Sequence, residues 1–163
     1  MSNRYKIRQK LISIGDDFWI ENANGQKVFK VDGKALRIRK TLEFEDANGK
    51  KLARIKERLI SIKDTMVIED AKGKDVATVK KALIAPLRDK WNVNVKGGAD
   101  LVVQGNILDL EYDIKQGRRK VAEVSKKWFT ITDTYGVDIE DGQNDILILA
   151  IAVAIDMMAH DET

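Results

Sequence analysis

A run of ten residues near the C-terminus, Ile146 to Ile155, is apolar on every face of a helix. A helix without a polar face belongs either in a protein core or in a membrane. Spanning a bilayer takes about 20 apolar residues, and this run ends at Asp156. The pattern therefore predicts a core helix over residues 144–159, with Asn144 as its N-cap.

Most of the remaining chain alternates apolar and polar residues, as strands with one buried face do. Three segments repeat at a step of 24 residues, and each places Asn-Gly or Lys-Gly between two alternating runs: 18–31, 42–55 and 66–79. Glycine supplies the positive φ of tight hairpins, and Asn22, Asp46 and Asp70 can cap the turns. Each repeat is predicted to be a β-hairpin.

Other short alternating runs predict further strands at 5–10, 11–14, 36–39, 59–62, 91–95, 101–103, 107–114, 120–124, 128–131 and 135–139. We expect a β-barrel with a central α-helix, in which about twelve antiparallel strands over residues 4–140 wrap around the hydrophobic C-terminal helix. A closed barrel removes its own sheet edges and offers the helix an apolar lumen. A solenoid or a β-propeller, which a repeat of this length also suits, has no such place for the helix.

Composition indicates one domain over residues 1–163, because the single proline and the lack of a flexible tract leave no interdomain linker. The absence of cysteine excludes disulfides and thiolate chemistry. The first residues hold no apolar stretch that would serve as a signal peptide, so we expect a cytoplasmic protein.

Charge is divided unevenly along the chain. Residues 1–130 carry all 29 Lys and Arg against 18 acids, whereas residues 131–163 carry eight acids and no Lys or Arg. Alternation places cations on shared strand faces, and the predicted anion-binding wall consists of Lys6, Arg8, Lys10, Arg37, Arg39, Arg54, Lys56 and Arg58. Such a wall suits anionic phospholipid, an acidic protein or, less well, nucleic acid. The simpler interpretation is a hydrated surface paired with acids such as Glu43, Glu45 and Glu57.

No residue pattern points to catalysis, a metal or a cofactor. His160 is the only histidine, the acidic stretch 133–145 lacks the spacing of an EF-hand loop, and no glycine-rich phosphate loop is present. Trp19, Trp91 and Trp128 fall at strand positions, where core packing is a commoner use of indole than stacking on bases. We therefore expect a protein that is not an enzyme.

Five segments in this order resemble the LURP-one-related family of the Tubby C-terminal-like superfamily, to which phospholipid scramblases are related: Ile14-Gly-Asp-Asp-Phe18, Phe29-Lys-Val-Asp-Gly-Lys34, Arg88-Asp-Lys-Trp91, Thr130-Ile-Thr-Asp-Thr-Tyr-Gly-Val137 and the helix 145–158. The resemblance covers essentially the whole chain. It implies a twelve-stranded antiparallel barrel around a central hydrophobic helix, which agrees with the pattern above.

Relatives within this superfamily include tubby domains that bind phosphoinositides. The chain lacks the cysteines and the proline-rich extension of the scramblases, so scramblase activity is not expected. The resulting hypothesis is a cytoplasmic, non-catalytic module that attaches peripherally to anionic phospholipid or to an acidic protein through the basic wall. The alternatives are a nucleic-acid-binding barrel and an interaction protein without lipid affinity.

Overall fold

The computed structural model describes residues 2–8, 17–32, 41–57, 65–81, 90–129 and 134–160, without the side chains of Arg8, Glu57 and His160. These residues contain twelve strands and one helix. The strands are β1 (Ser2–Arg8), β2 (Phe18–Glu21), β3 (Lys27–Asp32), β4 (Thr41–Asp46), β5 (Lys51–Glu57), β6 (Thr65–Asp70), β7 (Asp75–Lys80), β8 (Lys90–Val95), β9 (Leu101–Asn106), β10 (Glu111–Gln116), β11 (Arg119–Ser125) and β12 (Thr134–Glu140), and the helix is α2 (Asp145–His160).

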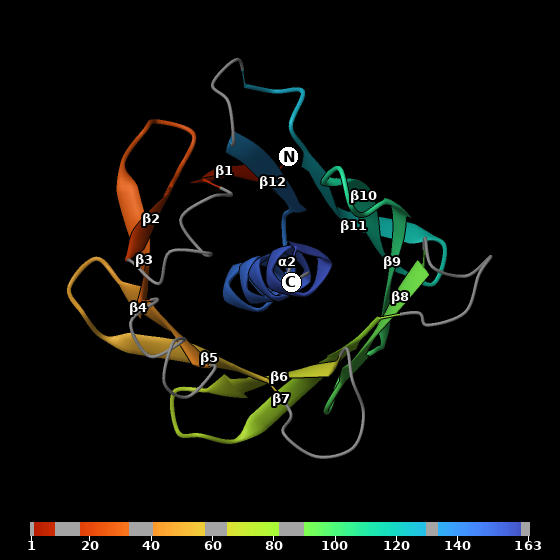
Figure 1. Ribbon diagram of the computed structural model, residues 1–163, viewed down its shortest axis with the longest axis horizontal. Coiled ribbons are helices and arrows are strands. Elements are labelled where there is room, and N and C mark those ends of the chain that lie inside the picture. The colour runs from red at the N-terminus through yellow and green to blue at the C-terminus, as the bar shows by residue number, and fades with distance from the viewer. Residues whose placement is uncertain are drawn as a thin grey trace.

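The strands follow one another around a closed barrel, and β1 completes the circle by lying between β12 and β2 (Figure 1). Every strand pairing is antiparallel. Alternate residues of each strand point into the barrel, as Phe18 and Ile20 do in β2 and Leu42 and Phe44 do in β4, and these side chains are fully buried. The predicted barrel is confirmed.

The three repeated segments form the hairpins β2–β3, β4–β5 and β6–β7. In each turn, the side-chain Oδ1 of Asn22, Asp46 or Asp70 accepts two backbone N–H bonds of 2.8–3.0 Å. The glycine that follows has a φ between 77° and 86°, a range that costs other residues energy. The sequence repeat is thus a repeat of one turn geometry.

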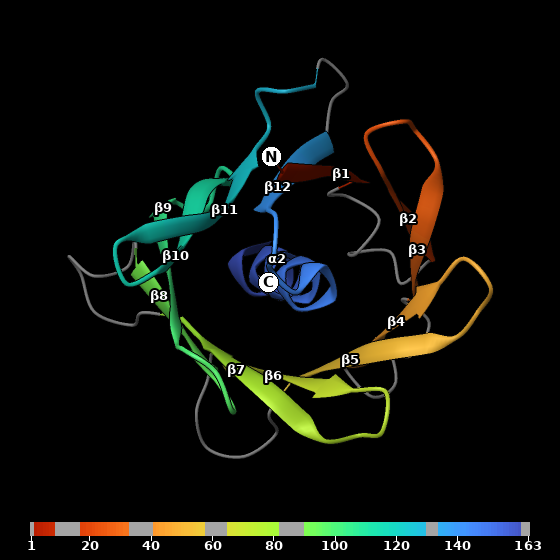
Figure 2. The ribbon, with the colours of Figure 1, turned by 180° about the vertical axis from the view of Figure 1, so that it is seen from behind.

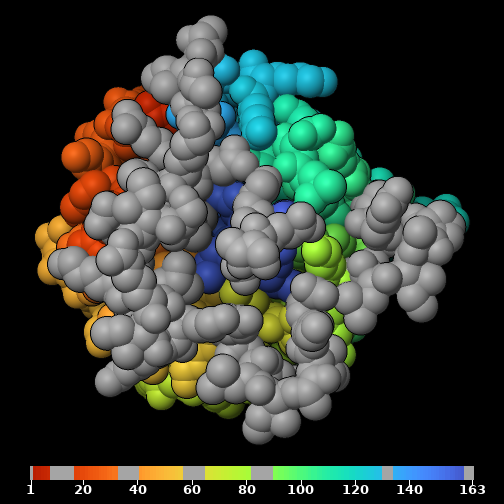
Figure 3. Space-filling view, viewed as in Figure 1, coloured from red at the N-terminus to blue at the C-terminus, as the bar shows by residue number. Residues whose placement is uncertain are grey.

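Helix α2 follows β12 in the chain and fills the lumen of the barrel (Figure 1). All side chains from Ile148 to Ala159 are buried, and Leu149 and Val153 are completely so. The Asn144 side chain accepts a hydrogen bond from the backbone N–H of Leu147, at 3.1 Å, which confirms the predicted N-cap. Figure 3 shows atoms of the helix at the centre of the molecule, ringed by the strands.

Two predicted strands are partly turns. Residues 107–110 form a turn between β9 and β10, because Asn106 accepts the backbone N–H of Asp109 at 3.3 Å and bonds its carboxylate. Residues 126–128 also form a turn, since the Glu111 carboxylate accepts both the Ser125 hydroxyl and the backbone N–H of Lys126. The predicted strands 11–14, 36–39 and 59–62 lie outside the described residues.

Strand direction gives the barrel two ends, which we name by the chain segments found there. The hairpin end carries the turns 22–26, 47–50, 71–74, 96–100 and 117–118 together with the start of α2. The connector end carries the last residues of β1, β3, β5 and β7 and the last turn of α2. Seen from behind, the hairpins β2–β3, β4–β5 and β6–β7 succeed one another along one arc of the wall (Figure 2).

Candidate functional site

Arg54 and Lys56 are on the outer face of β5, because Ala53 and Ile55, which alternate with them, are buried in the core. The Arg54 guanidinium lies 3.2 Å from a Glu43 carboxylate oxygen on β4 and 3.8 Å from one of Glu69 on β6. The Lys56 Nζ atom lies 3.2 Å from the other Glu69 oxygen. Acids on both neighbouring strands therefore pair with these two predicted cations.

Lys6 is on the outer face of β1, apart from the β5 pair. Its Nζ atom lies 2.9 Å from the Glu21 carboxylate on β2 and 6.0 Å from the Phe129 ring centroid. Four strand-to-strand steps separate β1 from β5 around the barrel, which corresponds to about 19 Å along the wall. Lys6 and the β5 cations therefore do not form one cluster.

The other predicted cations are next in sequence to strand ends that meet at the connector end. Lys10, Arg37, Arg39 and Arg58 lie outside the described residues, and Arg8 is the last residue of β1. The strand ends of β1–β5 that flank these residues are described: β1 ends at Arg8, β2 begins at Phe18, β3 ends at Asp32, β4 begins at Thr41 and β5 ends at Glu57. These ends share the connector end of five adjacent strands. By sequence, the segment 33–40 holds four basic residues and no acid.

An aromatic pair lies on the outside of β12. The sequence did not predict it, because Trp128 was assigned to a strand. Trp128 and Phe129 cover the backbone of Gly136, where an added Cβ would lie 2.5 Å and 2.8 Å from their ring atoms. The Arg4 guanidinium stacks over Trp128 at 4.0 Å and lies 3.3 Å from the Asp138 carboxylate. The sequence signal for this packing was Gly136 itself, because a glycine inside a strand often marks a place where another group packs close to the backbone.

The other tryptophans divide between core and surface. Trp91 is 1% exposed and packs in the core, as predicted. Trp19 is only half-buried, and Lys27 Nζ lies 5.7 Å from its ring centroid. Trp128 therefore shares with Trp19 a surface position against a cation, which is a common use of indole.

A carboxylate with two tyrosines forms a polar cluster inside the barrel. The Tyr135 hydroxyl donates a hydrogen bond of 3.2 Å to Asp156 on α2. Burial, followed by the nearby Asp156 charge, raises the pKa of both Tyr135 and Tyr112. All three side chains are at most 3% exposed, so a solute reaches them only if the barrel opens. The cluster is a structural feature of the lumen.

Among the described residues, no three His, Cys, Asp or Glu side chains converge in a way that could hold a metal ion. Within the same part of the chain, no helix has both the length and the apolar character required to cross a membrane.

Comparison with protein-family models matches the chain to "LURP-one-related" over residues 3–156. The fold is similar to an X-ray structure of a protein from Arabidopsis thaliana, with a TM-score of 0.71, 19% sequence identity and coverage of 95% of this chain and 90% of that chain. This likeness supports the fold alone. None of the curated proteins compared with the chain matches it significantly. Since the family match spans nearly all of the barrel and the helix, the chain belongs to the LURP-one-related family.

Proposed function

We propose that this protein is a non-catalytic binding module that attaches to anionic phospholipid surfaces through the connector end of strands β1–β5. One observation carries the proposal: the described ends of β1–β5 that flank Lys10, Arg37, Arg39 and Arg58 in sequence, with Arg8 among them, share this end of five adjacent strands. The strand ends next to these residues, which the sequence spreads over 51 positions, thus lie on one side of the barrel, and this arrangement supports the proposal.

The arrangement suits a flat charged surface. Five adjacent strands span about 19 Å, and a bilayer with anionic lipid attracts each nearby Lys or Arg by about 1 kcal/mol. The hairpin end is less suited, because its exposed lysines alternate with Asp46, Asp70, Asp75 and Asp100. Lys6, Arg54 and Lys56 are held by acids on the wall, so we assign them a smaller share of the binding.

The test is flotation with phosphatidylcholine vesicles, alone or with phosphatidylserine or a phosphoinositide, at low and near-physiological salt. The test variant R8Q/R37Q/R39Q/R58Q removes four cations of the connector end. The matched control K50Q/K72Q/K74Q/K96Q removes four exposed lysines of the hairpin end and gives the same net charge. The test variant should bind roughly a thousandfold more weakly, at about 1 kcal/mol per cation, and the control should float like the wild type.

Equal losses in the two variants would show that net charge alone drives binding, which would contradict the assignment to one end. Absence of wild-type flotation at low salt would remove the lipid hypothesis altogether. Oligonucleotide competition runs in parallel: complete displacement by nucleic acid, without dependence on the lipid head group, would favour the nucleic-acid alternative.

A further inference from the structure

The seam between β1 and β2 is the least paired in the described barrel. These strands share one paired position, Lys6 with Glu21, whereas every other neighbouring pair of strands shares four to seven. Strand β2 ends at Glu21 and the chain turns away through residues 22–26. The Ser2–Tyr5 half of β1 therefore continues beyond β2. No described strand pairs with it on that side, which we call its free edge.

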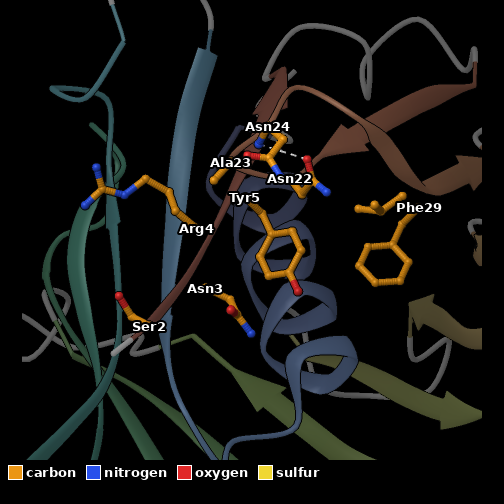
Figure 4. A pocket seen from close by; sticks show the side chains of 9 residues that line it. Ser2, Asn3, Arg4, Tyr5, Asn22, Ala23, Asn24 and Phe29 are labelled. Carbon is orange, nitrogen blue, oxygen red and sulfur yellow. Dashed lines mark hydrogen bonds between the residues drawn. The ribbon is translucent and has the colours of Figure 1, made fainter.

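A groove of about 360 Å³ lies along this free edge, at the hairpin end of the barrel (Figure 4). Residues 2–5 line one side, and residues 22–24 with Val28 and Phe29 line the other. The ring centroids of Tyr5 and Phe29 lie 5.9 Å apart. Figure 4 shows the two rings next to each other, one from each side of the groove. The groove thus combines a strand edge with an aromatic floor.

Four charged or polar side chains at the groove, Asn3, Arg4, Tyr5 and Asn22, are engaged by other described residues, and Ser2 and Asn24, which also line it, are uncharged. Arg4 points away from it, toward Trp128 and Asp138. The Asp145 carboxylate accepts hydrogen bonds from the Asn3 amide and the Tyr5 hydroxyl. The side-chain oxygen of Asn22 accepts backbone N–H groups of its own turn. The edge of β1 consequently offers backbone groups, rather than a charge, to an occupant.

We infer that the Ser2–Tyr5 edge binds an extended, uncharged peptide segment of a partner protein, which adds to the barrel as a strand. An exposed strand edge is a template for such pairing, in which main-chain hydrogen bonds supply affinity and a side-chain pocket supplies specificity. An apolar side chain of the peptide packs on Tyr5 and Phe29. This site is independent of the proposed lipid surface, because it lies at the opposite end of the barrel.

The experiment selects binders from a phage-displayed library of short random peptides and compares two tryptophan variants. Ala23 is exposed and lines the groove, so Ala23→Trp should fill it. Ala47 has the equivalent exposed position in the next hairpin, so Ala47→Trp is the matched control. Selected peptides should alternate apolar and polar residues, lose affinity by about tenfold or more for Ala23→Trp, and bind Ala47→Trp like the wild type.

Backbone pairing is tested on the selected peptide itself. N-methylation of alternate amides in one register should abolish binding, whereas methylation in the other register should be tolerated, since only one set of amides faces β1. Thermal unfolding checks that both tryptophan variants fold. Failure to enrich any peptide over the Ala23→Trp variant, or binding indifferent to methylation in both registers, would overturn the inference.

Discussion

At the scale of single residues, Gly136 shows how one missing side chain shapes the outer wall. Two aromatic rings occupy the space above it, and Arg4 covers one of them. The Glu111 carboxylate fixes the segment that carries these rings, because it accepts hydrogen bonds from the Ser125 hydroxyl and the backbone N–H of Lys126. A glycine in the middle of β12 therefore allows a segment after β11 to pack across the sheet.

Replacing Gly136 by alanine should lower the free energy of unfolding by about 1–3 kcal/mol, the usual cost of overpacking. The new Cβ would lie within 3 Å of ring atoms of both Trp128 and Phe129, and rigid rings have to move as a whole. Chemical denaturation measures the loss, and a red shift of tryptophan emission reports the displaced ring. Gly98→Ala is the control, since its Cβ meets only a Val95 side-chain atom at 3.3 Å. Equal losses at the two positions would contradict this account.

Asp70 links one turn to pH. Hydrogen bonds from the backbone N–H groups of Lys74 and Lys72, with the charges of these lysines, lower its pKa below the ordinary value of 3.8. Because the pKa is lower in the folded state, the stabilisation is present above pH 3.8 and is lost as pH falls through the folded pKa.

Asp70→Asn should keep the turn but remove this pH dependence, because Asn22 makes the same bonds in the first hairpin. The wild type should be the more stable protein near neutral pH, and the difference should shrink below pH 3.8 and disappear once the pH has fallen through the lower folded-state pKa. Thermal melts of both proteins across this range measure it. A difference that persists unchanged in acid would show that the charge of Asp70 has no part in the turn.

At the scale of elements, the hairpins and the helix were predictable because each depends on local chemistry. The turn residues Asn22, Asp46 and Asp70 make their bonds within four residues, and the apolar run of α2 excludes any position but the core. The turns at 107–110 and 126–128 were not predictable. The apolar and polar alternation continues in sequence past the ends of β9 and β11. Strand β9 ends because Asn106 caps the next turn, and β11 ends where the Glu111 carboxylate of another strand accepts the backbone N–H of Lys126.

The helix provides the sharpest test at this scale. Leu149 is completely buried in the lumen, so Leu149→Asp should unfold the barrel, because an unpaired buried charge costs several kcal/mol. Leu149→Met keeps the volume nearly constant and should cost less than about 1.5 kcal/mol. Circular dichroism melts distinguish the two. A cooperative, wild-type-like melt of the aspartate variant would place the helix outside the barrel.

At the scale of the whole molecule, the two ends of the barrel have different roles in this account. The sequence pattern selected eight cations but could not assign them to a surface, because neighbours across a barrel depend on strand order. Strand order separates Lys6 from Arg54 and Lys56. Each of these three cations pairs with an acid on a strand next to its own. It also brings together, at one end of the barrel, the strand ends that flank Lys10, Arg37, Arg39 and Arg58 in sequence, and the proposed lipid surface depends on this arrangement.

The proposed lipid surface at the connector end is tested by measuring which end of the barrel meets a bilayer. The chain has no cysteine, so Ala35→Cys, in the segment between β3 and β4, and Ala47→Cys, at the hairpin end, each accept one environment-sensitive fluorophore without changing the charge. On anionic vesicles, the label at position 35 should brighten and shift to the blue, while the label at position 47 should stay unchanged. A response at position 47 alone, or at neither position, would show that the connector end of the barrel does not meet the bilayer.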